Sequence, residues 1–133
     1  MLTAINHITI AVSNLQKSLV FYHQLLGFKR KVSWQTGAYM TLADHWFCLS
    51  VGEVAPAGDY SHLALSLSQQ DFSSTVLKLQ QEKVIEWQKN SSEGDSFYFL
   101  DPDGHQLELH VGNLESRLNA LKMSTTECVY YDD

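Results

Sequence analysis

Three side chains in this sequence have the types and positions that could hold a metal ion: His7, His62 and Glu108. Each histidine opens one of two matching runs, Asn-His-Ile-Thr-Ile-Ala-Val-Ser at 6–13 and Ser-His-Leu-Ala-Leu-Ser-Leu-Ser at 61–68. Period-two alternation places each histidine on the polar face of a strand, opposite the branched aliphatic residues. Two imidazoles and one carboxylate from three strands leave coordination positions open for a substrate, as catalytic metal sites do.

Other polar residues share these faces. Burying them without partners would cost about 1–3 kcal/mol each, which favours a cavity that holds water, metal or ligand. Cys48 is the counterpart of Glu108 in the duplication, so it is either a fourth ligand or a small buried thiol, and we expect the thiol. His110 corresponds to Ser50, which could not bind a metal ion in the same way. We therefore expect His110 either to support the ligands from beside them or to pack against its neighbours. The other histidines are expected to face solvent: His23, His45 and His105.

A duplicated unit would position these residues. The run at 105–111 repeats the run at 45–51, and the spacing leaves five extra residues in the second copy, where 90–96 is the expected enlarged loop. A repeat of this length predicts a strand, a helix and about three further strands per copy. We expect strands at 36–42, 46–51, 85–88, 97–100 and 106–111.

Each copy also predicts an amphipathic helix after its first strand. Ser13 and Ser68 are the expected N-caps, and Gly27 ends the first helix. Asp-Pro-Asp-Gly at 101–104 predicts a hairpin turn. The expected fold class is α+β, a single domain of two paired βαβββ modules. The first spans about 3–52 and the second about 59–112, and a C-terminal helix and tail follow at 113–133.

Composition limits the possible partners and the compartment. The 133 residues, 44% of them hydrophobic, suffice for one domain core. No apolar run is long enough to span a bilayer, and the N-terminus lacks the pattern of a signal peptide. A net charge of −6 disfavours nucleic acid, and the two cysteines do not suggest a disulfide framework. We therefore expect a cytoplasmic protein with neither nucleic acid nor membrane as partner.

From residue 1 to about residue 121, the sequence resembles the vicinal oxygen chelate superfamily, and within it the fosfomycin-resistance glutathione transferases. The Asp-Pro-Asp-Gly-His turn at 101–105 is common across the superfamily. The Ser-Glu-Gly segment at 92–94 that precedes this turn is specific to a far smaller part of the superfamily. Further matching stretches are 6–13, 37–39, 48–50 with Trp46, and 59–62.

The resemblance implies a domain-swapped homodimer with Mn²⁺ bound by His7 of one subunit and by His62 and Glu108 of the other. Fosfomycin, a phosphonate epoxide, would fill the open positions while glutathione thiolate attacks a ring carbon. Tyr39 would act in catalysis by contacting the thiol or helping to deprotonate it, and Thr9 would act in catalysis and substrate binding. The other implied fosfomycin contacts are Trp46, Tyr60, Lys89, Ser92, Tyr98 and Arg117. The implied loop for an activating K⁺ consists of Asn90, Ser92, Glu93, Gly94 and Ser96. Imidazole and carboxylate ligands also suit Zn²⁺ or Ni²⁺, so manganese rests on the resemblance.

One position departs from the family pattern. Where relatives have a lysine directly after the tryptophan, this chain has Gln88 after Trp87, and the lysine follows as Lys89. A shift of one residue in a strand reverses the side-chain direction, so Lys89 reaches the phosphonate only if the loop register slides with it.

Other functions stay open. A related enzyme could open fosfomycin with another thiol or with water, although the hydrolase would need an extra carboxylate, and Asp44 lies at an expected turn. A glyoxalase-type isomerase or a ring-cleaving dioxygenase would share the fold. Such an enzyme should have either a carboxylate ligand in place of Cys48 or a set of two histidines and one glutamate suited to iron. A non-catalytic protein that sequesters the drug is disfavoured by the open metal positions and by Tyr39.

Overall fold

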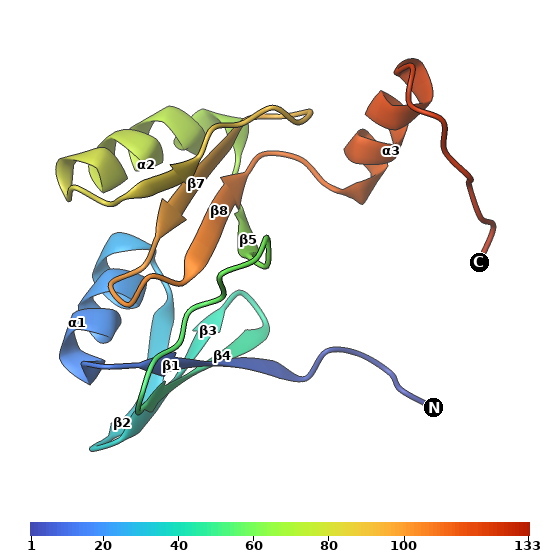
Figure 1. Cartoon of the computed structure of the whole chain (residues 1–133). Coiled ribbons are helices and arrows are strands. Elements are labelled where there is room, and N and C mark those ends of the chain that lie inside the picture. The colour runs from blue at the N-terminus through green and yellow to red at the C-terminus, as the bar shows by residue number, and fades with distance from the viewer.

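Two four-stranded sheets, one from each half of the chain, make up the computed structural model, which describes residues 1–133 (Figure 1). Each sheet has the same strand order: the first strand of its half lies at one edge, followed by the fourth, third and second. The first and fourth strands are parallel, and the other pairs are antiparallel. This arrangement confirms the predicted α+β class.

The first half contains four strands and one short helical segment. The strands are β1 (His7–Val12), β2 (Lys29–Trp34), β3 (Gly37–Leu42) and β4 (His45–Val51). Helix α1 (Leu15–Leu19) continues directly into the π-helical turn η1 (Val20–Leu25), and Gly27 follows it at a φ of +83°. Strand β2 has no counterpart among the predicted strands, because all six of its residues are exposed and its pattern shows no alternation.

The second half repeats this plan with a longer helix. Its elements are β5 (Leu63–Ser66), α2 (Gln69–Gln81), β6 (Glu86–Gln88), β7 (Ser96–Leu100) and β8 (Gln106–His110). Ser68 caps α2 as predicted, since its Oγ accepts a hydrogen bond from the Asp71 amide at 3.2 Å. The last helix, α3 (Leu114–Met123), is capped by Asn113 and contains no buried residue.

The predicted cap of the first helix is wrong by one residue. Asn14 caps α1, with its Oδ1 accepting from the Lys17 amide at 3.0 Å. The Ser13 hydroxyl and amide bind Asp103 instead, in the hairpin turn between β7 and β8. A contact between the two halves of the chain has therefore replaced the local capping bond that the sequence predicts.

The hairpin turn at 101–104 forms as predicted and contacts the first half at several points. The Gly104 amide donates to the Asp101 carbonyl at 3.1 Å, and Gly104 takes a φ of +90°. His105 Nε2 lies 2.7 Å from the Ala11 carbonyl on β1. His105 is therefore partly buried, contrary to expectation, and so is His23, whose Nδ1 lies 2.7 Å from the Phe28 carbonyl. His45 is exposed as expected.

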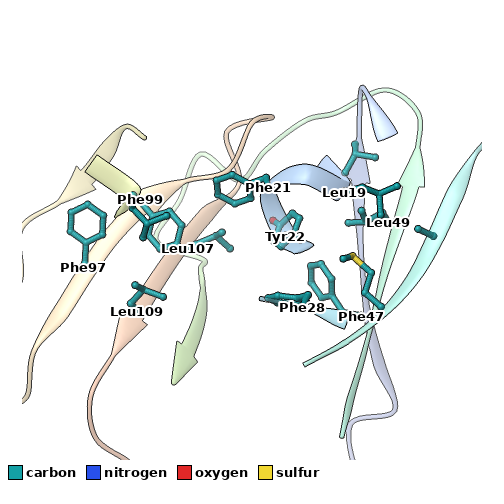
Figure 2. Close-up of a cluster of buried hydrophobic side chains, with 14 residues drawn as sticks. Leu19, Phe21, Tyr22, Phe28, Phe47, Leu49, Phe97, Phe99, Leu107 and Leu109 are labelled. Atoms are coloured by element: carbon teal, nitrogen blue, oxygen red, sulfur yellow. The ribbon is translucent and has the colours of Figure 1, made fainter. Parts of the chain in front are cut away.

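One cluster of fourteen buried side chains spans both halves (Figure 2). Tyr22, Phe28 and Phe99 are among its fully buried members. Phe21 of η1 contacts Phe99 of β7, with ring centroids 6.2 Å apart, so the helical segment of the first half packs on the sheet of the second. Burying each such ring contributes about 1.5–3 kcal/mol, so the shared cluster stabilises the contact between the two halves. None of the helices combines the length and the apolar character that crossing a membrane demands.

Candidate metal centre

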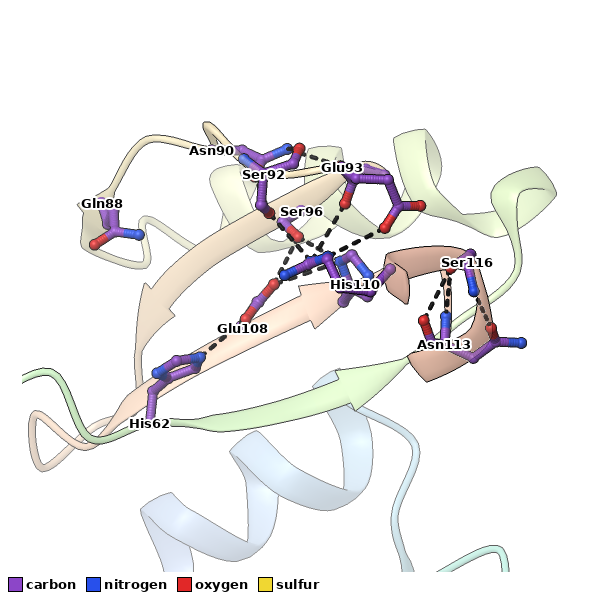
Figure 3. A network of polar contacts seen from close by, with 12 residues as sticks. His62, Gln88, Asn90, Ser92, Glu93, Ser96, Glu108, His110, Asn113 and Ser116 are labelled. Carbon is purple, nitrogen blue, oxygen red and sulfur yellow. Dashed lines mark hydrogen bonds and ion pairs between the residues drawn. The ribbon is translucent and has the colours of Figure 1, made fainter. Parts of the chain in front are cut away.

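His62 and Glu108 meet on the polar face of the second sheet (Figure 3). Glu108 pairs with Ala64, and His62 lies two residues before Ala64 on the same face, as alternation predicts. His62 Nε2 lies 3.0 Å from Glu108 Oε1, and Glu108 is 6% exposed. The structure thus brings together two of the three predicted ligand residues.

The hydrogen bonds around His62 define which of its nitrogens is free. Its Nδ1 lies 3.0 Å from the Tyr60 carbonyl, which only accepts, so Nδ1 carries the proton of a neutral ring. In a neutral ring Nε2 is then the acceptor that faces Glu108 Oε1 across 3.0 Å, whereas in a protonated ring Nε2 donates to this carboxylate as an ion pair. A divalent metal ion can take the place of the Nε2 proton, because an imidazole nitrogen and a carboxylate oxygen are both suitable ligands. The donor set therefore fits a metal.

The third predicted ligand, His7, belongs to the other sheet. It is exposed at the start of β1, where its Nδ1 lies 2.7 Å from Asn6 Oδ1, so its Nε2 is also left as the free acceptor. No group of three histidine, cysteine, aspartate or glutamate side chains in the chain is placed to hold a metal ion. His7 has a free Nε2 that could bind a metal ion, but within one chain it does not lie beside His62 and Glu108.

A row of aromatic side chains begins beside His7 on the polar face of the first sheet. The Trp46 ring lies 4.4 Å from the His7 ring, Tyr39 stands edge-on to Trp46 at 5.1 Å, and Trp34 continues the row at 4.9 Å from Tyr39. The three larger rings remain 37–44% exposed. Exposed aromatic rings in a row of this kind form a wall for a ligand or for another protein surface.

Thr9 and Cys48 occupy the next position on this face. They are paired across β1 and β4, and Tyr39 pairs with Cys48 from β3. Cys48 is buried. It lies on the sheet that lacks Glu108, which matches the expectation of a small packed thiol.

Three aromatic residues enclose His62 in the same way. Tyr60, Trp87 and Tyr98 have ring centroids 5.1–6.1 Å from the His62 ring. Tyr98 is buried and pairs with Glu108, whereas Tyr60 is exposed and its hydroxyl accepts from Gln88 Nε2 at 2.9 Å. The predicted contacts Tyr60 and Tyr98 therefore both border the metal-ligand pair.

The structure corrects the placement of Lys89. A bulge between Glu86 and Gln88 pairs Gln88 with Tyr98, so Gln88 is the residue that faces the site. Lys89 lies beyond the end of β6, leaves 87% of its side chain exposed, and forms an ion pair with Glu86. The one-residue shift thus has the effect expected of a strand: it turns the lysine away from the site.

The loop at 90–96 is closed by the Asn90 side chain. Asn90 Nδ2 donates to the carbonyls of Gly94 at 2.8 Å and Ser92 at 3.5 Å, and its Oδ1 accepts from the Ser92 amide and hydroxyl. Arg117 of α3 contacts this loop, with Nε 3.2 Å from Glu93 Oε2 and Nη2 3.4 Å from Ser92 Oγ. Four of the predicted loop residues therefore form one connected group with Arg117, whereas Ser96 bonds to Glu108 and His110 instead.

Residues 4–109 match the family model of the Glyoxalase/Bleomycin resistance protein/Dioxygenase superfamily. The chain belongs to this superfamily. Within it, the chain is 51% identical to glutathione transferase FosA of Serratia marcescens over 127 residues, or 92% of this chain and 90% of FosA. It is 34% identical to metallothiol transferase FosB of Staphylococcus epidermidis, over 99% of this chain and 98% of FosB.

Solved structures of the same superfamily share the fold. FosX, a fosfomycin resistance protein from Listeria monocytogenes that was crystallised with Mn(II) and sulfate, has a TM-score of 0.80 to this chain at 28% identity. The match covers 90% of this chain and 98% of FosX. The predicted resemblance to fosfomycin-resistance enzymes is thereby confirmed.

Three residues of the site were not among those predicted: Trp34, Trp87 and Gln88. Trp34 pairs with Gly37, where a Cβ would lie 2.7 Å from the Trp34 ring, but the exposed strand β2 carries no sequence pattern that would have revealed it. Trp87 had no local signal either, because its place beside His62 depends on the bulge in β6.

Proposed function

We propose that this protein transfers glutathione to the epoxide of fosfomycin in a metal-dependent reaction. The single observation that carries the metal-dependent step is the opposition of His62 Nε2 and Glu108 Oε1 at 3.0 Å, which prepares a cation site on an otherwise buried carboxylate. The choice of reaction is supported by the 51% identity to glutathione transferase FosA over nearly the full length of both chains.

The working unit of this proposal is a homodimer. The chain exposes 9417 Å², whereas a compact monomer of 15.1 kDa is expected to expose about 7,100 Å². The excess of about 2,300 Å² lies within the area of about 1,000–2,500 Å² that one subunit of an obligate dimer buries, and the exposed terminal segments at 1–6 and 124–133 contribute part of it. The absence of buried residues in α3 adds to this excess.

A second copy would also complete the ligand set. His7 begins β1 and His62 immediately precedes β5, and both strands lie at open edges of their sheets. Open edges expose unpaired backbone groups and invite coverage by another chain. A partner that covers these edges would bring its own His7 to His62 and Glu108, and each dimer would hold two shared sites.

His7, His62 and Glu108 are the residues that would hold the ion, and Mn²⁺ is our choice by analogy with the Mn(II) complex of FosX. The bound ion supplies a Lewis acid that stabilises the negative charge developing on the epoxide oxygen. The Tyr60 carbonyl keeps the His62 tautomer correct for this purpose, because it takes the Nδ1 proton and leaves Nε2 free.

The remaining predicted residues bind and orient the two substrates. Arg117, held against the loop by Glu93, offers its guanidinium to the phosphonate, and hydroxyls come from Thr9, Tyr60, Ser92 and Tyr98. Trp46 forms the apolar wall against the epoxide methyl, and Tyr39, in edge contact with it, holds the attacking thiol. Gln88 replaces Lys89 in this group, so one neutral amide stands where a cation was expected.

The loop at 90–96 is proposed as the site of an activating K⁺. The carbonyl oxygens of Ser92 and Gly94 converge on one amide nitrogen of Asn90. Convergent carbonyls of this kind are suitable ligands for a hard cation once the amide turns aside. Glu93 and Ser96 would complete the set.

Turnover of fosfomycin by metal-stripped protein tests the proposal, with Mn²⁺, K⁺, glutathione and alternative thiols added back separately. Mass spectrometry distinguishes the glutathione adduct from the diol that water produces and from adducts of other thiols. We expect the glutathione adduct only when Mn²⁺ is present, no product from His62→Ala, and full activity from the control His45→Ala, whose histidine is exposed at the start of β4. Formation of no glutathione adduct with any metal would refute the proposal.

A further inference from the structure

His110 lies two residues beyond Glu108 on β8, and the Ser96 hydroxyl connects its ring to that carboxylate (Figure 3). Ser96 Oγ lies 2.6 Å from Glu108 Oε2 and 2.7 Å from His110 Nδ1. An ionised carboxylate only accepts hydrogen bonds, so the single hydroxyl proton of Ser96 is donated to Glu108. The Ser96 oxygen then accepts a hydrogen bond from His110 Nδ1–H, whose direct distance to Glu108 Oε2 is 3.5 Å, longer than either bond through Ser96.

Two glycines approach the His110 ring closely. Gly94 and Gly112 flank the ring at φ values of +79° and +141°, which few other residues adopt. A Cβ at Gly94 would lie 3.0 Å from His110 Cε1, and one at Gly112 would lie 2.8 Å from His110 Nε2. A Cβ at Gly94 would also lie 2.4 Å from the Val111 carbonyl, and one at Gly112 would lie 3.0 Å from Ser116 Oγ, so both glycines are required by the surrounding backbone as well as by the His110 ring.

We infer that His110 is a positioning residue that acts through Ser96 to hold the Glu108 carboxylate in its metal-binding orientation. The inference rests on the proposed function, because it takes Glu108 as a metal ligand. Ser96 occupies Oε2, so Oε1 is the oxygen that faces His62 Nε2. When His110 is lost, the Ser96 hydroxyl loses the partner that orients it, and the carboxylate regains rotational freedom before any substrate binds.

Titration of the metal-stripped, full-length protein with Mn²⁺ alone tests this role, with the electron paramagnetic resonance signal of the free ion as the readout. His110→Ala is expected to weaken Mn²⁺ binding about 10- to 100-fold. His110→Asn can place an amide N–H where Nδ1 was, so its affinity should stay within about threefold of the wild type. His110→Gln places its amide near the former Nε2 instead, and should behave like the alanine variant. Equal affinities of the asparagine and glutamine variants would overturn the inference.

Ser96→Ala provides the second variant, because it breaks the same chain of bonds at its middle. If His110 acts through Ser96, the double variant binds Mn²⁺ no more weakly than the weaker single variant. Additive losses would contradict this route, and the control His45→Ala should leave binding unchanged. Wild-type protein that binds Mn²⁺ but forms no glutathione adduct would sink the proposed function and leave this inference standing. Wild-type protein that binds no Mn²⁺ would overturn both.

Discussion

The hydroxyl of Tyr22 donates a hydrogen bond to Asp101 Oδ2 at 2.8 Å and so joins the helical segment of the first half to the hairpin turn of the second. Both residues are buried, at 0% and 5% exposure. Asp101 Oδ1 meanwhile accepts the amides of Asp103 and His105, at 2.9 Å each. One buried carboxylate therefore shapes the turn with one oxygen and attaches it to the other half with the second.

Tyr22→Phe should lower the free energy of unfolding by about 1.5–3 kcal/mol, because it removes a hydrogen bond to a buried charged group and leaves Asp101 Oδ2 without a partner. Guanidinium chloride unfolding measures the change. Tyr131→Phe is the matched control, since Tyr131 is 79% exposed and its replacement should leave stability unaltered. A Tyr22→Phe variant as stable as the wild type would show that the bond contributes nothing.

The same tyrosine predicts how stability changes in alkali. Burial, followed by the nearby charge of Asp101, raises the pKa of Tyr22 well above its ordinary value of 10.0. Above pH 10 the unfolded chain loses this proton while the folded chain retains it, so the folded state binds more protons and stability falls as pH rises. Unfolding curves from about pH 8 to about pH 11 should show the advantage of the wild type over Tyr22→Phe shrinking only in the alkaline range. A constant difference across that range would contradict the shift.

If the two subunits of a dimer share each metal site, two inactive variants should regain activity when they form mixed dimers. His7→Ala and Glu108→Gln should each abolish fosfomycin turnover, because each removes one proposed ligand from both sites of a dimer. In a co-expressed mixture, half of the dimers combine the two variants, and each of these holds one site with all three ligands. About a quarter of the wild-type activity should therefore return. If each site lay within one chain, no activity would return at any ratio of the two variants.

The sequence predicted those features that depend on neighbouring residues. Alternation in β5 and β8 is a local property, so it placed His62 and Glu108 on one face, where the structure has them. Ser13 and His105 were misplaced because their partners, Asp103 and Ala11, lie about 90 residues away along the chain.

Features of the site that arise from irregular backbone also escaped prediction. The bulge at Trp87 places Gln88, in place of Trp87, opposite Tyr98, and no residue pattern in the sequence predicts a bulge of this kind. Strand β2 is an exposed edge with a bulge of its own, so it lacks the apolar face from which strands are recognised.

The register of β6 leads to opposite expectations for two neighbouring residues. Lys89→Ala should leave the kcat and KM for fosfomycin unchanged, since Lys89 is exposed and paired with Glu86. Gln88→Lys places a cation beside Tyr60 and should lower the KM for fosfomycin about 3- to 10-fold, because a charge-assisted bond to the phosphonate replaces a neutral one. Steady-state kinetics at saturating glutathione and Mn²⁺ measures both effects. If Lys89→Ala raised the KM instead, the lysine would have to reach the site in the working dimer, and the bulge in β6 would have to relax when substrate binds.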